Sequence, residues 1–138
     1  MRISGRLTQI LGVAAVALAI GACEDGFGPG LEVEIEEVTL RVADETATVR
    51  VGGAAAMTVA EGTHDVTINV RDTSNRLVLL GIDYELVIDS GNQGVARYSP
   101  LTNLEGTLVT APGTATLTVG IRHGSHSHFG APVTINVN

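Results

Sequence analysis

An alternation of apolar and polar residues runs through most of this chain, and it limits the fold more than any other feature. Residues 113–122, GTATLTVGIR, place an apolar side chain at every second position from Ala115 to Ile121. Successive side chains of a β-strand point to opposite faces of the sheet, so a period of two predicts strands with one buried face. Gly, Pro, Asn and Asp separate such segments about every eight to twelve residues, as turns between short strands do.

The pattern predicts an all-β fold, a β-sandwich of about seven to eight antiparallel strands, with a closed barrel as the alternative. The uneven strand lengths favour the sandwich. Residues 53–60 (GAAAMTVA) begin with a run of three alanines after Gly53, but the glycines before it favour a loop or a strand over a helix. Leu77–Ile82 (LVLLGI) is an apolar run, and we expect a buried strand there in preference to a surface for a partner.

The first predicted strand, residues 33–42, changes phase at Glu36-Glu37. Because side chains alternate strictly along a strand, a phase change predicts a bulge or a strand that passes from one sheet to the other. The acidic run of residues 32–37 offers carboxylates to Ca²⁺. In a strand, however, Glu32, Glu34 and Glu36 line the solvent face, and this is the interpretation that we favour.

The first 22 residues are typical of a signal peptide. Arg2 and Arg6 supply a positive start, and the uncharged apolar run of residues 10–20 is short for a bilayer span. The next residues, Ile20-Gly21-Ala22-Cys23, resemble the lipobox of bacterial lipoproteins. This resemblance implies cleavage before Cys23, acylation of its thiol and a further acyl chain on the new amino terminus. An ordinary secretory signal that ends in a cysteine is the alternative.

Cys23 is the only cysteine in the chain, which favours the lipoprotein interpretation, because a lone exported thiol has a use at a lipidation site. At about 0.8 kcal/mol per buried methylene, two or three acyl chains hold a protein on a membrane essentially permanently. Residues 23–31 are then the lipidated cysteine and a glycine-rich tether of at most about 26 Å, and residues 32–138 are the domain. Glu24, where inner-membrane lipoproteins commonly have Asp, implies the outer membrane, with the periplasmic or surface face left open.

The charge of the mature chain indicates which partners to expect. Without Arg2 and Arg6, six arginines and no lysine stand against fifteen acidic residues, a net charge of −9. A strongly acidic domain repels nucleic acid, so we expect none as a partner. The expected partners are the membrane, through the lipid anchor, and possible proteins of the cell envelope.

The order of the motifs suggests a family. VTLRV, TATVRVGG, VTINVRDTSNRLV, VARYS, PGTATLTVGI and PVTINV follow one another between residues 36 and 137. This series resembles the bacterial immunoglobulin-like domains of surface and secreted proteins, above all at PGTATLTV (112–119). The resemblance implies an immunoglobulin-like β-sandwich. The chain departs from that pattern at the middle strand, where such domains commonly carry a Trp and this sequence has Tyr84 or Leu86.

Three of the four histidines lie together in HGSHSHF, residues 123–129. His126 and His128 are two apart and point the same way in an extended strand, and a turn at Gly124-Ser125 brings His123 alongside. Such a set, with His64 as a conceivable fourth ligand, predicts a Zn²⁺ or Cu²⁺ site. The interpretation that we favour is a structural hairpin loop between strands that end at Arg122 and resume near Pro132, with Phe129 capping the sandwich. Sensing of pH and recognition of a partner remain open as well.

Nothing in the sequence predicts catalysis. The nearest acidic residue before the histidines is Glu105 and none follows them, so no local carboxylate serves as a general base. Ser125 and Ser127 lack the GxSxG context of a nucleophile. We therefore expect a lipid-anchored protein of the cell envelope with a non-catalytic binding or structural module and no cofactor. An envelope metal-binding protein that uses the histidines is the alternative.

Overall fold

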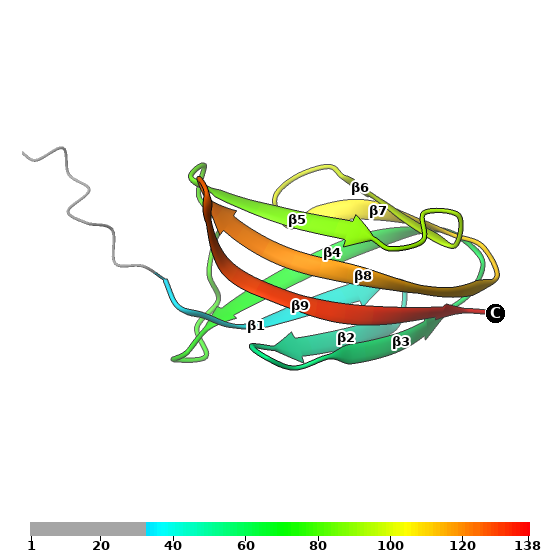
Figure 1. Ribbon diagram of the computed structural model, residues 1–138, viewed down its shortest axis with the longest axis horizontal. Helices are drawn as coiled ribbons and strands as arrows, with labels where there is room; N and C mark the ends of the chain where they lie inside the picture. The colour runs from blue at the N-terminus through cyan, green and yellow to red at the C-terminus, as the bar shows by residue number, and fades with distance from the viewer. Residues whose placement is uncertain (1–32) are drawn as a thin grey trace, which may run out of the picture. The chain divides into compact units, whose positions relative to one another are not determined.

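A computed structural model describes residues 33–138, and within them every regular element is a strand. The signal peptide, Cys23 and the tether, predicted from residues 1–31, lie outside the described residues. The described part of the chain contains nine strands (Figure 1): β1 (Ile35–Val42), β2 (Glu45–Arg50), β3 (Ala55–Val59), β4 (Gly62–Asp72), β5 (Tyr84–Ser90), β6 (Ala96–Pro100), β7 (Glu105–Thr110), β8 (Gly113–His123) and β9 (His126–Val137).

The strands form two sheets that face each other as a β-sandwich, as the alternating pattern predicted (Figure 1). One sheet has the order β2-β1-β4-β7-β6 and the other the order β3-β9-β8-β5. If β1, β4, β5, β6, β7, β8 and β9 are labelled A to G in chain order, the sheets contain ABED and CFG. This is the arrangement of immunoglobulin constant-type domains, here with β2 and β3 added between the first two strands.

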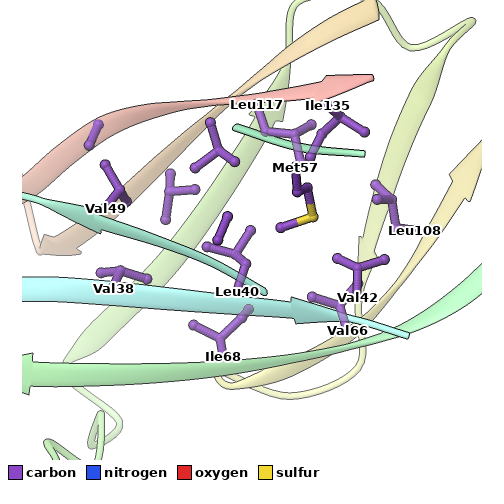
Figure 2. Close-up of a cluster of buried hydrophobic side chains, with 14 of the residues drawn as sticks. Val38, Leu40, Val42, Val49, Met57, Val66, Ile68, Leu108, Leu117 and Ile135 are labelled. Carbon is purple, nitrogen blue, oxygen red and sulfur yellow. The ribbon is translucent and has the colours of Figure 1, made fainter. Parts of the chain in front are cut away.

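The core between the sheets is aliphatic, because the inward positions of the strands hold Val, Leu, Ile and Ala. Side chains from both sheets meet in it, among them Leu40 of β1 and Ile135 of β9 (Figure 2). Phe129 is the one aromatic side chain in the core among the described residues. Burial of such side chains supplies most of the favourable free energy of folding, about 1.5–3 kcal/mol for each large one.

The phase change in the first strand is a bulge. The register of β1 against β4 shifts between Ile35 and Glu37, and β1 stays in one sheet throughout. The chain passes to the second sheet one connection later, between β2 and β3, where Gly52 has a φ of 72°. Residues 55–59 therefore form a strand, and β3 pairs with β9 in parallel.

The prediction of a buried strand at residues 77–82 is wrong. Only an isolated bridge joins Leu77 to Arg71, and this segment belongs to the connection between β4 and β5. Val78 and Leu80 pack against the core, whereas Leu77, Leu79 and Ile82 are exposed. An apolar run gives the same sequence signal whether it is buried or exposed, because hydropathy does not record what covers it.

The two ends of the sandwich hold different connections. At one end, β1 and β5 begin, β2 and β4 finish, and the β8–β9 hairpin turns. We call this the histidine end. The opposite end holds the β1–β2, β3–β4, β5–β6 and β7–β8 connections, with Glu61 N–H bonded to Asn138 O there at 3.3 Å. Figure 1 shows the first strand entering at the histidine end, beside the starts of β5 and β9.

Candidate functional site

Two of the predicted histidines and a tyrosine form a cluster of rings at the histidine end. The ring of Tyr84 stacks on His123 with 5.1 Å between centroids and an interplanar angle of 23°. The same tyrosine meets His128 edge-on at 5.4 Å, and the two imidazoles lie 5.9 Å apart. We call Tyr84, His123 and His128 the ring cluster.

The hairpin between β8 and β9 positions this cluster, and it is tighter than the sequence predicted. The turn consists of Gly124 and Ser125 alone, and Gly124 has a φ of 57°, which suits the first central position of a type II′ turn. His123 and His126 are therefore paired strand residues and not members of a long loop. The prediction that the second strand begins near Pro132 is wrong, because β9 already starts at His126.

A bulge in β9 turns His128 toward the tyrosine. Ile121 pairs with Phe129 and Arg122 with Ser127, which leaves His128 as the extra residue between two pairs. A bulge shifts the alternation of faces, so His126 and His128 do not share one environment as strict alternation would require. His126 is exposed, whereas His128 is half-buried. Phe129 next to it is buried, as expected for a side chain that caps the core.

One nitrogen of the cluster is left without a partner. The Nε2 atom of His128 is buried and accepts or donates no hydrogen bond among the described residues. Buried polar atoms are normally bonded, and an unpaired one destabilises the fold by about 1–3 kcal/mol. The arrangement therefore offers a buried, unpaired imidazole nitrogen next to a second imidazole.

The structure does not bring all four predicted metal ligands together. His64 lies near the start of β4, at the opposite end of the sandwich, where its Nε2 bonds Ala60 O at 2.9 Å. The length of β9 separates it from the hairpin, roughly 35 Å at about 3.3 Å per strand residue. Among residues 33–138 no group of three or more His, Cys, Asp or Glu side chains is arranged to hold a metal ion.

The predicted acidic run is divided between solvent and an ion pair. Glu34 is exposed and Glu36 half-buried, while Glu37 binds Arg50 of β2 at 3.1 Å. Glu32 lies outside the described residues. The three carboxylates in the described part of this run, those of Glu34, Glu36 and Glu37, therefore lie in different surroundings.

An open groove lies beside the ring cluster, where β5 and the β6–β7 hairpin form the free side of the sandwich. Its volume is about 440 Å³. The Asn103 side-chain amide donates to Tyr84 O at 3.4 Å across it. The groove is lined by Glu85, Leu86, Pro100, Leu101, Thr102 and Asn103.

Sequence reasoning missed a second feature of the histidine end, its exposed apolar side chains. Ile82 is fully exposed, Leu79 is 85% exposed and Leu77 is 59% exposed, all in the β4–β5 connection. Val51, after β2, and Leu101, in the β6–β7 hairpin, are exposed as well. The one signal in the sequence was the run LVLLGI itself, which we assigned to the core.

Comparison with known proteins gives no family. No protein-family model matches the chain, and no curated protein matches it either.

The described residues include no helix of the length and hydrophobicity needed to cross a bilayer.

Proposed function

We propose that this protein is a lipid-anchored component of a bacterial cell envelope whose immunoglobulin-like β-sandwich is a non-catalytic binding or structural module. The observation that carries the proposal is Cys23, the only cysteine, placed directly after an uncharged apolar run and the residues Ile20-Gly21-Ala22. The match of this segment to a lipobox supports acylation at that position. The β-sandwich that follows supports a folded domain close to the anchor.

The sandwich offers two kinds of surface on which such a module can act. Immunoglobulin-like domains present clustered loops at their ends and free strand edges at their sides, and both serve as binding surfaces. Here β5 and β6 are the edge strands on the side of the groove, and the ring cluster lies at one end. We propose a protein of the envelope as the partner and the outer membrane as the location.

Labelling with palmitate in cells tests the anchor. We expect label in the wild-type protein and none in Cys23→Ala, because the thiol is the acylated atom. Glu24→Gln is the matched control, since it changes the neighbouring residue and keeps the thiol. Label that persists in Cys23→Ala contradicts the proposal, and so does a wild-type protein that takes up no label.

A second candidate function is metal binding, favoured by the unpaired Nε2 of His128 beside His123. Two imidazoles would bind Zn²⁺ or Cu²⁺ together with solvent or a ligand from another molecule. Calorimetry on the soluble Cys23→Ser protein tests this. We expect binding tighter than about micromolar that is lost in His123→Ala with His128→Ala, and kept in His64→Ala, which lies at the opposite end. Equal binding by all variants, or none by the parent, rules the function out.

A further inference from the structure

The large exposed apolar side chains of this domain are not scattered. Six occur among residues 33–138, and three of them, Leu77, Leu79 and Ile82, lie in the β4–β5 connection at the histidine end. Val51 adjoins the same end, because its N–H bonds Glu36 O at the start of β1 (3.0 Å). Leu101 lies in the hairpin that reaches Tyr84 through Asn103. Scattered apolar residues need no explanation, but a gathered set marks a contact surface.

Hydrogen bonds fix the first half of the connection that carries these residues. The Asp72 carboxylate accepts hydrogen bonds from the N–H groups of Ser74 and Arg76, both at 2.9 Å, and from the Arg76 guanidinium. Val78 N–H bonds Val70 O at 2.9 Å. Val78 and Leu80 point to the core, so the residues between and beside them point outward. Leu77 and Leu79 therefore face outward beside a segment whose first half is fixed by hydrogen bonds.

The chain enters the domain at the base of this surface. Thr73 N–H donates to Glu34 O at 3.3 Å, which joins the first described residues to the β4–β5 connection. Ten Cα–Cα steps separate Cys23 from Val33, so the two residues lie at most about 36 Å apart. Whatever surface holds Cys23 is thus within reach of the histidine end.

The opposite end of the domain is polar. Its connections present Asp44, Glu61, Asn92, Gln93 and Asn138 to solvent. Val109, the sixth exposed apolar residue, lies within β7 at 37% exposure and not in a connection. The exposed apolar side chains therefore gather at the end where the chain enters the domain, and the polar connections lie at the far end.

We propose that the histidine end rests on the lipid surface, with Leu77, Leu79 and Ile82 inserted into the boundary between headgroups and acyl chains. This inference rests on the proposed acylation of Cys23. Arg76 of the β4–β5 connection pairs with Asp72, and Arg71 at the end of β4 is balanced in number by Asp83, so the attraction is apolar and not electrostatic. A short tether raises the local concentration of the surface to the millimolar range, which lets a few aliphatic side chains hold the orientation. The polar end then faces away from the membrane, toward partners.

Site-specific fluorescence on the acylated protein tests this orientation. Because the thiol of Cys23 is consumed by acylation, a new cysteine is the only site for a polarity-sensitive maleimide dye. Leu79→Cys places the dye in the surface, and Gln93→Cys places the same dye at the opposite end as the control. Each labelled protein is reconstituted in phosphatidylcholine and phosphatidylethanolamine vesicles with and without a lipid-borne quencher, and palmitate incorporation is measured on the same samples.

We expect the quencher to remove about half or more of the emission at position 79, because residues of interfacial segments lie about 5–10 Å into the boundary. Position 93 keeps its emission. Adding Leu77→Ser and Ile82→Ser to the Leu79→Cys protein reduces the quenching severalfold, which shows that the side chains and not the dye drive insertion. Raising the salt to about 1 M leaves the quenching unchanged, since the contact is apolar.

Four results overturn the inference. Equal quenching at both positions means that the domain has no fixed orientation. Palmitate incorporation without quenching at position 79 refutes the membrane contact and leaves the anchor intact. Absence of palmitate removes the anchor and the inference together. A dye at position 79 that is shielded in whole cells but not in pure lipid vesicles assigns the surface to a protein partner.

Discussion

Tyr98→Phe is expected to stabilise this domain, and the structure shows why. Tyr98 lies on β6 opposite Leu108, and its ring packs over Gly106. Its hydroxyl oxygen is buried and has no hydrogen-bond partner among the described residues. In the unfolded chain the same hydroxyl binds water, so folding strips it of a hydrogen bond and returns none. Phe keeps the ring and deletes only the oxygen.

The expected gain follows from the free energy of an unpaired buried polar group, about 1–3 kcal/mol. We expect the lower part of this range, about 1 kcal/mol, because β6 is an edge strand and the Tyr98 side chain as a whole is only half-buried. For a domain of this size that corresponds to a rise in Tm of about 4 °C. Urea unfolding followed by circular dichroism on the Cys23→Ser protein measures the difference. An unchanged or lower unfolding free energy at equal m-value refutes the reasoning, since it means that the hydroxyl is satisfied.

The same substitution changes the response to alkaline pH. Burial raises the pKa of the Tyr98 phenol above its ordinary value of 10.0. Above about pH 10 the phenol ionises in the unfolded chain before it ionises in the folded one, so stability falls as pH rises. The Phe variant lacks this contribution, and its advantage over the wild type widens between about pH 9 and 11. A constant difference across that range contradicts the assignment.

Three further outcomes follow from contacts described above. Gly106→Ala is expected to lower the unfolding free energy by about 1–3 kcal/mol in urea melts, because the added Cβ would lie 2.5 Å from the Tyr98 ring. The loss should shrink in a Tyr98→Ala background. A loss of equal size there would exclude the clash as its cause. The N–H of Arg76 and its guanidinium lower the pKa of Asp72 below its ordinary value of 3.8. Stability is therefore lost as pH falls through that region, and thermal melts of Asp72→Asn should vary less between about pH 5 and 2; parallel curves would disprove this. Leu79→Ser should change stability by less than about 0.5 kcal/mol, whereas Leu40→Ala should cost about 2–5 kcal/mol, and a large loss for Leu79→Ser would mean that this residue belongs to the core.

The sequence was sufficient to predict the class of fold because the signal is local and repeated. Threonine alternates with aliphatic residues through β8, and the inward positions of that strand, Leu117, Val119 and Ile121, are buried. Because one face of each strand meets the core, every position of the strand must be either apolar or polar according to the face on which it lies. The same alternation marks β2, where Ala47 and Val49 are buried, but the parallel pairing of β3 with β9 left no comparable trace, since it joins residues far apart in sequence.

The candidate site was predicted only in part, and for a different reason. The proximity of His123 and His128 was expected, but the side chain that joins them is Tyr84, on a strand nearly forty residues earlier. The bulge at His128 could not be read from HGSHSHF, because polar residues give no alternation from which a phase shift is visible. His64 was included for its residue type alone, and chain topology placed it at the opposite end.

The parallel pairing of β3 with β9 also governs how the chain acquires its structure. β9 lies between β8 and β3 and pairs with both, so the strand that is synthesised after the other eight occupies the middle of its sheet. Its inward residues, from Phe129 to Val137, complete the core. Until they arrive, residues 55–59 have no neighbour in their own sheet, and the contacts that define the native state span most of the domain. Such non-local topologies fold in milliseconds to seconds. A partly synthesised chain that lacks β9 therefore cannot complete the second sheet or close the core.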